Sequence, residues 1–211
     1  MSGKLKAGVL ISGRGSNLKA LIDACAATDF PARIVTVISN VANAGGLTYA
    51  REAAIPCKVI PHKEFSSRET FDAAVDAELR LAGAELVCEA GFMRIHSDGF
   101  VRDWLGKIIN IHPSLLPAFK GTHVHEQVIA AGVKVSGCTV HYVTPELDSG
   151  PIIAQSEVPV IAGDTPESLA ARVLEAEHRL YPMVLKGIAE GRVRLENGRV
   201  ISDLSPRARD R

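Results

Sequence analysis

Residues 7–25 read AGVLISGRGSNLKALIDAC and contain the first unit of the fold. The apolar run at 7–11 is typical of a buried strand. Residues 12–17 form a glycine-rich polar loop, and 18–25 are predicted to form a helix. A strand, a glycine-rich loop and a helix in this order predict an alternating α/β fold.

The same alternation continues along the chain. Further strands are expected at 34–38, 58–60, 85–88 and 107–110, and further helices at 46–53, 68–81 and 125–131. Residues 135–143 and 152–160 could form an antiparallel pair, and a long helix is expected from Thr165-Pro166 to about 186. The sequence therefore predicts an α/β, Rossmann-like, mostly parallel twisted sheet flanked by helices, with antiparallel strands in the C-terminal half. No repeat or low-complexity linker interrupts it, so residues 1–211 are expected to form a single domain, with a flexible tail at about 202–211.

Residues 107–114 read KIINIHPS and indicate a functional site. The β-branched run predicts a strand that Pro113 ends, and ligands of an open parallel sheet collect where its strands end. Asn110 and His112 are two residues apart and therefore share a face. An amide can donate to a developing oxyanion, and an imidazole can move a proton near neutral pH. From these residues alone, a polar strand end whose histidine is satisfied by its neighbours is an equal alternative.

A carboxylate in a second segment strengthens this prediction. Residues 137–143 alternate like a strand, and a turn-rich loop at 144–151 carries Asp148 between apolar and turn-forming residues. A partly desolvated carboxylate near His112 would favour the imidazolium form. Alone, Asp148 is more typical of a loop residue that bonds its own backbone. With Asn110, the three residues predict an acid/base and oxyanion site that uses no metal.

The loop at 12–17 predicts a phosphate site. Glycines let the backbone approach an anion, and N–H groups at a helix start hold phosphate. A dinucleotide fingerprint fits poorly, because Leu18 stands where Gly or Ala is needed and no acidic residue follows the second strand. The alternative is a glycine-rich turn that caps a helix. If the loop binds a single phosphate, a bulky residue at Gly15 is expected to weaken nucleotide binding alone.

Composition limits the classes of partner. Lys+Arg 24 balance Asp+Glu 24, which argues against nucleic acid. No apolar run reaches the length of a membrane span, and residues 1–4 begin no signal peptide. The four cysteines share no metal-ligand spacing, so we expect buried free thiols, no metal site and a cytoplasmic location.

Three motifs carry a resemblance to a known family: NIHPSLLP at 110–117, GCTVHYV at 137–143 and LDSGPI at 147–152. They occur in family order, and the chain resembles the folate-dependent formyltransferases from about Gly8 to about Gly191. The resemblance implies that 10-formyltetrahydrofolate, as co-substrate, gives its formyl group to the amine of 5′-phosphoribosylglycinamide in purine biosynthesis. It further implies small-molecule substrates, no metal, and a monomer or homodimer.

The resemblance also implies which residues bind the substrates. The phosphate would lie against Gly15, Ser16 and Asn17, and Glu177 would contact the ribose and glycinamide part. By default Glu177 would be a surface helix residue and Arg68 a solvated one, but the resemblance places Arg68 against the glutamate tail of the folate. The folate pocket would comprise Arg68, Met93, Arg94, Ile95, His96, Asn110, Thr144, Pro145, Glu146, Leu147 and Asp148.

The implied mechanism uses the same three polar residues. Asn110 would donate to the oxyanion, and His112, protonated with help from Asp148, would add to its stabilisation. The proton could pass through His112 or through a water held by Asp148. His123, His125 and His141 are expected to be structural.

Three alternatives remain. A formyltetrahydrofolate hydrolase uses the same Asn, His and Asp, but its family carries an N-terminal regulatory domain and usually His-His-Ser where this chain has His112-Pro113-Ser114. A tRNA formyltransferase would add a nucleic-acid domain, for which only about twenty residues follow the predicted core. A non-catalytic nucleotide-binding module would leave Asn110, His112 and Asp148 without a role.

Overall fold

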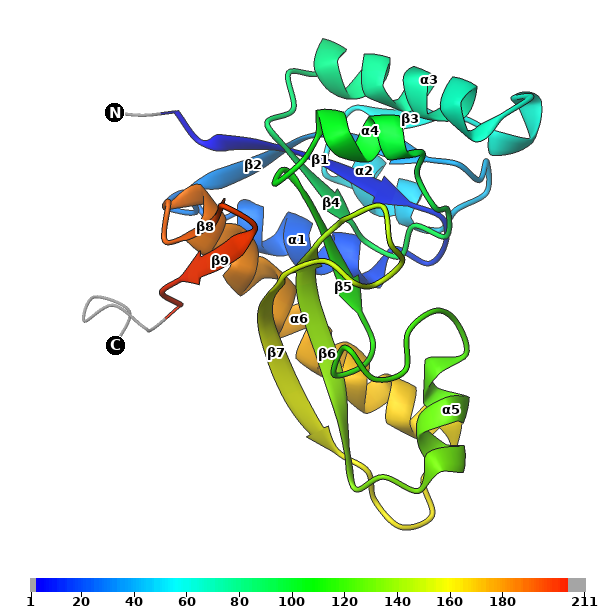
Figure 1. Ribbon diagram of the computed structural model, residues 1–211. Coiled ribbons are helices and arrows are strands. Elements are labelled where there is room, and N and C mark those ends of the chain that lie inside the picture. Colours follow the sequence, from blue (N-terminus) through cyan, green and yellow to red (C-terminus); the bar gives the residue numbers. More distant parts are fainter. Residues whose placement is uncertain (1–2, 205–211) are drawn as a thin grey trace.

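The apolar runs of the sequence form one seven-stranded sheet in the computed structural model, which describes residues 3–204 (Figure 1). The strands are β1 (Leu5–Ile11), β2 (Ala32–Ser39), β3 (Cys57–Val59), β4 (Leu86–Glu89), β5 (Ile108–His112), β6 (Val135–Tyr142) and β7 (Ile152–Pro159). Their order across the sheet is β3-β2-β1-β4-β5-β6-β7. The pairs from β3 to β5 are parallel, whereas β6 and β7 join antiparallel, which confirms the predicted fold class.

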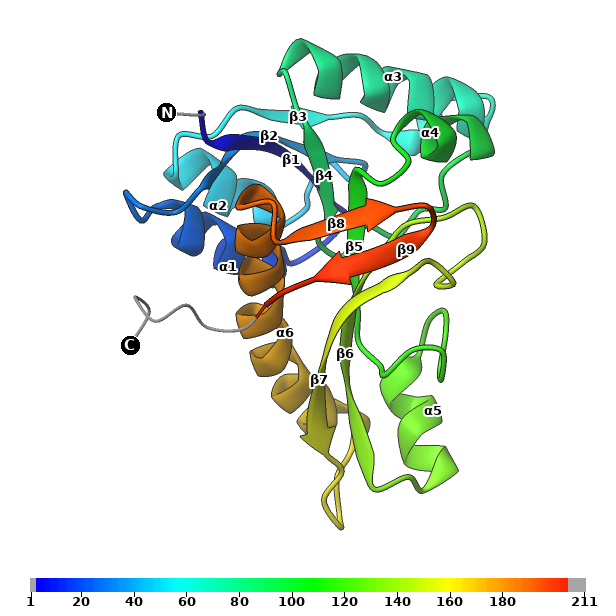
Figure 2. The ribbon, with the colours of Figure 1, turned by 60° about the vertical axis from the view of Figure 1, so that its left-hand side comes forward.

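Helices cover both faces of this sheet. They are α1 (Ser16–Cys25), α2 (Gly46–Glu52), α3 (Arg68–Leu81), α4 (Asp98–Asp103), α5 (Val124–Ala131) and α6 (Pro166–Ala189), with a short 3-10 helix, η1 (His62–Glu64). Figures 1 and 2 show α3 and α4 on one face and α1, α2 and α6 on the other. Ser67 caps α3 by accepting from the Thr70 N–H. Within residues 3–204, no helix is long and apolar enough to cross a membrane.

The strand order creates a crevice at the carboxyl edge of the sheet. The chain leaves β1 towards β2 on one side and returns to β4 on the other side of β1. The loops after β1 and β4 therefore diverge, and such a switch point is where open α/β sheets bind ligands.

Four short elements were not predicted from the sequence. They are the 3-10 helix η1, helix α4, which is only six residues long, and the two strands of a hairpin that follows α6, β8 (Val193–Glu196) and β9 (Arg199–Ser202). The hairpin turns through Asn197 and Gly198, whose φ angles of 50° and 75° suit a type I′ turn. Ser202, expected to begin a flexible tail, is the last residue of β9, and residues 205–211 of that predicted tail lie outside the described residues.

The cysteines do not pair. All four thiols are free, as expected; Cys88 and Cys138 are buried in the core, while Cys25 and Cys57 are only half-buried. Burial raises the pKa of the Cys138 thiol to about 12, which keeps it protonated and unreactive at neutral pH.

Candidate active site

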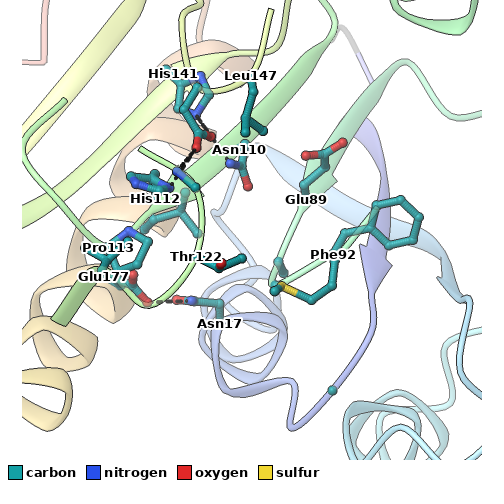
Figure 3. Close-up of a pocket in the computed structure, with 18 of the residues that line it drawn as sticks. Asn17, Glu89, Phe92, Asn110, His112, Pro113, Thr122, His141, Leu147 and Glu177 are labelled. Atoms are coloured by element: carbon teal, nitrogen blue, oxygen red, sulfur yellow. Dashed lines mark hydrogen bonds and ion pairs between the residues drawn. The ribbon is translucent and has the colours of Figure 1, made fainter. Parts of the chain in front are cut away.

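A cavity of about 920 Å³ occupies the carboxyl edge of the sheet, between the loops after β1, β4 and β5 and helix α6 (Figure 3). Almost all the residues predicted to form a site line this cavity: Gly15, Ser16, Asn17, Met93, Arg94, Ile95, His96, Asn110, His112, Thr144, Pro145, Glu146, Leu147, Asp148 and Glu177. Arg68 is not part of the lining. It begins α3, and its guanidinium donates to the carbonyl of His96 at 3.4 Å.

His112 and Asp148 meet in this cavity, as the sequence predicts. His112 is the last residue of β5, and its Nδ1 lies 3.5 Å from Oδ2 of Asp148. Both side chains are at least nine-tenths buried. The Gly121 N–H donates to the same Asp148 oxygen at 2.8 Å, which holds the carboxylate in place. The backbone of Asp148 has a left-handed φ of 47°, so a tight turn directs this side chain inward.

The second nitrogen of His112 defines which atom can exchange a proton. Nε2 lies 2.8 Å from the carbonyl oxygen of Phe119. A carbonyl can only accept, so Nε2 carries a hydrogen. Nδ1 is therefore the ring nitrogen that gains and loses a proton, and it does so beside Asp148.

Asn110 is oriented by a histidine that was expected to be only structural. The two residues are register partners on β5 and β6, and Asn110 Nδ2 lies 3.3 Å from His141 Nε2. His141 Nδ1 lies 3.0 Å from the Tyr142 carbonyl oxygen, so Nδ1 carries the hydrogen and Nε2 accepts from Asn110. Burial lowers the pKa of His141, which keeps the ring neutral. One amide N–H of Asn110 is thereby engaged, and the other remains available to a ligand.

Because His141 is neutral, its contact with Asp148 at 3.9 Å is not an ion pair. His123 and His125 also line the cavity, and the exposed His123 lies 3.5 Å from Glu126. Within residues 3–204, neither histidine is in hydrogen-bond contact with Asn110, His112 or Asp148. The role of His141 depends on the pairing of β5 with β6, which no local motif reveals.

The glycine-rich loop forms the opposite end of the cavity. Gly15 has a φ of 77°, and a Cβ there would lie 2.3 Å from Cα of Gly46. The expectation that a bulky residue at Gly15 would only block a ligand was therefore wrong, because such a residue collides with the start of α2. Gly13 also lines the cavity, and a Cβ there would meet nothing within 4 Å.

Asn17 and Glu177 join this loop to α6. Asn17 Nδ2 donates to Glu177 Oε2 at 2.7 Å, and both side chains are buried (Figure 3). Figure 3 shows this pair at one end of the cavity and Asn110, His141 and Leu147 at the other, with His112 between them. Burial, opposed by the Asn17 hydrogen bond, raises the pKa of Glu177 from 4.5 to about 7.

The raised pKa predicts a pH-dependent stability. As pH rises from about 4.5 to about 7, the unfolded chain releases the Glu177 proton and the folded chain keeps it, so the free energy of unfolding falls. Glu177→Gln removes the titrating group, so the free energy of unfolding of the variant should not show this fall. Over that interval it should rise by up to about 3 kcal/mol relative to that of the parent. Urea unfolding at pH 5 and pH 8, without ligands, measures the difference. Glu175→Gln, an exposed site on the same helix, is the control and should follow the parent at both pH values.

No three His, Cys, Asp or Glu side chains within residues 3–204 gather as a set of metal ligands. The polar groups of the cavity are instead suited to hydrogen bonding and proton transfer.

The formyl transferase family model matches residues 5–185. The chain is 45% identical over 187 residues to the phosphoribosylglycinamide formyltransferase of Escherichia coli (strain K12), covering 89% of this chain and 88% of that protein. It is 54% identical over 198 residues to the trifunctional purine biosynthetic protein adenosine-3 of Bos taurus. That match covers 93% of this chain and 20% of the relative, so the chain spans about a fifth of that protein's length.

Solved structures show the same fold. The glycinamide ribonucleotide transformylase 1 of Symbiobacterium toebii superposes with a TM-score of 0.92 and 46% identity, covering 96% of each chain. A formyltetrahydrofolate deformylase of Pseudomonas syringae pv. tomato superposes with a TM-score of 0.87 and 28% identity, over 95% of this chain and 66% of that one. Residues 5–185, which match the family model, include every residue that contributes to the cavity ends described above.

Proposed function

Since this chain belongs to the formyl transferase family, we propose that it transfers the formyl group of 10-formyltetrahydrofolate to the glycinamide amine of 5′-phosphoribosylglycinamide. The products would be the N-formyl nucleotide and tetrahydrofolate, in de novo purine biosynthesis. The names of the Escherichia coli and Symbiobacterium toebii relatives support this substrate. We also propose that the chain works in the cytoplasm, without a nucleic-acid partner, as a monomer or homodimer.

One observation carries the proposal: a single cavity has a phosphate-type loop at one end and an oxyanion and proton-transfer site farther along. The loop at Gly13–Asn17 starts α1, whose N–H groups suit a phosphate. Asn110, His112 and Asp148 line the same cavity, farther from the loop (Figure 3). A nucleotide that binds with its phosphate at the loop would extend its amine towards these residues.

The described residues account for the chemistry of formyl transfer. The folate supplies the formyl group on N10 and accepts the electron pair of the breaking bond. Asn110 donates its free amide N–H to the oxygen that becomes negative as the amine attacks, and His141 holds the amide in that orientation. When it carries the proton in transit, His112 adds a positive charge near the same oxygen.

Proton movement is assigned to the face of His112 that meets Asp148. The attacking amine must lose a proton and the leaving nitrogen must gain one. Nε2 of His112 is occupied by the Phe119 carbonyl, so the proton passes through Nδ1 or through a water held by Asp148. In either route Asp148 stabilises the positive charge that appears beside it.

The cavity fits the folate as well as the nucleotide. The cavity lining includes the exposed apolar side chains Met93, Ile95 and Leu147, which can lie against a flat heterocycle. Its volume of about 920 Å³ is at the upper end of the usual range for small-molecule sites. Arg68 lies outside the lining and donates to the His96 carbonyl. We propose that the glutamate tail of the folate leaves the cavity on this side, towards the Arg68 guanidinium.

Mass spectrometry tests the reaction directly. The enzyme is incubated with 5′-phosphoribosylglycinamide and 10-formyltetrahydrofolate, and the nucleotide should gain one formyl group. A parallel reaction with EDTA should proceed at the same rate, because no metal takes part in the proposed chemistry. An unmodified nucleotide after complete consumption of the folate would contradict the proposal.

A formyltetrahydrofolate hydrolase is the second candidate, supported by the similarity to the Pseudomonas syringae deformylase. Both reactions can use the same amide, imidazole and carboxylate. The buried pair Asn17–Glu177 next to the glycine-rich loop favours the transferase, because hydrolysis needs no site for a nucleotide.

The loop can be tested by a pair of valine variants. Gly13→Val points a side chain into open space where the phosphate is expected, so KM for the nucleotide should rise by roughly tenfold or more with the melting temperature unchanged. Gly15→Val should instead lower the melting temperature, because its Cβ collides with Gly46. Steady-state kinetics with each substrate varied, together with thermal unfolding, separate the two effects. An unchanged nucleotide KM in the Gly13→Val enzyme would show that the phosphate does not bind at this loop.

A further inference from the structure

The loop that follows β5, residues 113–121, contacts both members of the proton-transfer pair. The Phe119 carbonyl accepts from His112 Nε2 at 2.8 Å, and the Gly121 N–H donates to Asp148 Oδ2 at 2.8 Å. Phe119 has a left-handed φ of 54°, which residues other than glycine rarely adopt. Such a conformation persists only where the surrounding contacts hold it, so the position of the Phe119 carbonyl depends on what fixes this loop.

The Phe119 carbonyl competes with Asp148 for the hydrogen of the neutral His112 ring. A neutral imidazole has one N–H, and an acceptor lies beside each nitrogen: the carbonyl 2.8 Å from Nε2, and the carboxylate 3.5 Å from Nδ1. A carboxylate is the stronger acceptor, so the closer approach of the carbonyl is what keeps the hydrogen on Nε2. If the loop moved away, the hydrogen would shift to Nδ1, and Nδ1 could no longer take a proton from the attacking amine.

Thr139 holds the first half of this loop. It is fully buried on β6 as the register partner of His112 on β5, so the two side chains lie on the same face of the sheet. Thr139 Oγ1 donates to the Ser114 carbonyl at 2.6 Å and accepts from the Leu116 N–H at 3.0 Å. Ser114 Oγ in turn donates to the Ala118 carbonyl at 2.6 Å. These hydrogen bonds therefore connect β6 to the residue directly before the orienting carbonyl.

Gln155 holds the same contacts from outside the cavity. It is an exposed residue of β7, the edge strand of the sheet, and the register partner of Thr139. Its Nε2 donates to Thr139 Oγ1 at 2.9 Å and to the Leu116 carbonyl at 2.9 Å. The Thr139 hydroxyl thereby has its hydrogen and both lone pairs occupied, and has no capacity left for a substrate. His112, Thr139 and Gln155 form one row across β5, β6 and β7, and only His112 lines the cavity.

We propose that Gln155 is a positioning residue for formyl transfer. It acts through Thr139 and the loop at 113–121, and it keeps the hydrogen of the neutral His112 ring on Nε2. Gln155 itself touches neither the substrates nor the reacting atoms. This inference rests on the proposed function, because it takes His112 to be the group that moves the proton.

The variant Gln155→Leu tests this role. It removes two hydrogen bonds from an exposed edge position, where water can reach the Leu116 carbonyl, so the melting temperature should stay close to that of the parent. The single-turnover rate should fall roughly ten- to hundredfold, as a displacement of about 1 Å at a reacting group can cause. KM for each substrate should change little, because Gln155 does not line the cavity. Glu157→Leu, at an exposed position on the same strand, is the control and should match the parent.

Two measurements separate positioning of His112 from a general weakening of the fold. In the His112→Ala background, Gln155→Leu should slow transfer by less than about twofold, because its effect passes through a ring that is no longer present. In ¹⁵N-labelled parent protein, at a pH at which the ring is neutral, NMR correlation spectra should show His112 as the Nε2–H tautomer. Gln155→Leu and Thr139→Val should show a measurable share of the Nδ1–H tautomer, whereas Thr139→Ser keeps the hydroxyl and should restore the parent spectrum. The spectrum of His112→Ala assigns the signal.

The inference is overturned if folded Gln155→Leu keeps the parent's tautomer or the parent's single-turnover rate. An equal slowing with and without the His112 ring would also overturn it. The tautomer measurement needs no substrate, so the two proposals fail separately. A parent that formylates the nucleotide while Gln155→Leu keeps the Nε2–H tautomer would refute this inference alone, and a parent that formylates nothing would refute both.

Discussion

Replacing His112 with alanine is expected to lower kcat by roughly 10²–10⁴ while the chain remains folded. The reason is the arrangement of the ring: Nε2 donates to the Phe119 carbonyl, so Nδ1 alone can exchange a proton, and it lies beside Asp148. Alanine removes both the proton carrier and one positive group near the developing oxyanion. Asp148→Asn should cost a similar factor, because it keeps an oxygen for the Gly121 N–H but removes the charge that stabilises the imidazolium.

Steady-state kcat, single-turnover rates and melting temperatures would be measured on the same preparations. His178→Ala on α6 and Asp23→Asn on α1 are controls of matched residue type, since neither side chain lines the cavity. Single-turnover rates close to those of the parent in folded His112 and Asp148 variants would show that neither residue takes part in the chemical step.

Strand ends could be predicted from sequence because the rule that places them is local. Pro113 ends β5, and the two-residue alternation of a strand puts Asn110 and His112 on one face. The glycine-rich loop follows β1 directly, so its place at the same edge also follows from the alternation of strands and helices. The structure brings these residues into one cavity as expected, and their catalytic roles remain predictions.

The contacts that were missed depend on register between strands distant in sequence. His141 reaches Asn110 because β6 pairs antiparallel with β5, and Glu89 lies beside Asn110 because β4 pairs parallel with it. A one-residue slip in either pairing would turn the partner to the opposite face, and no local pattern determines that slip. For the hairpin a local signal did exist, because Asn197-Gly198 is a common sequence for a two-residue turn. Helix α4 gives little signal, since it has a single apolar turn and contains Gly99.

The remaining prediction separates transfer to an amine from transfer to water. Release of tetrahydrofolate should be several orders of magnitude faster with 5′-phosphoribosylglycinamide than without it. An amine held in line with the formyl carbon gains an effective molarity worth roughly 7–11 kcal/mol, which an unbound water does not receive. The residues that would hold the nucleotide, at Gly13–Asn17 and Glu177, lie in the same cavity as His112.

The assay follows the absorbance of the folate product at equal enzyme concentration, with the nucleotide, without it, and with ribose 5-phosphate. Ribose 5-phosphate can occupy the phosphate loop but carries no glycinamide amine, so it should not accelerate release. Acceleration by ribose 5-phosphate would mean that the loop only switches on hydrolysis, and equal rates in all three reactions would mean that water is the ordinary acceptor. Because Asn110, His112 and Asp148 would serve transfer to either acceptor, the difference between the two reactions must come from what the other end of the cavity holds. Dependence on the amine, and not on the phosphate alone, is therefore the result that identifies a transferase.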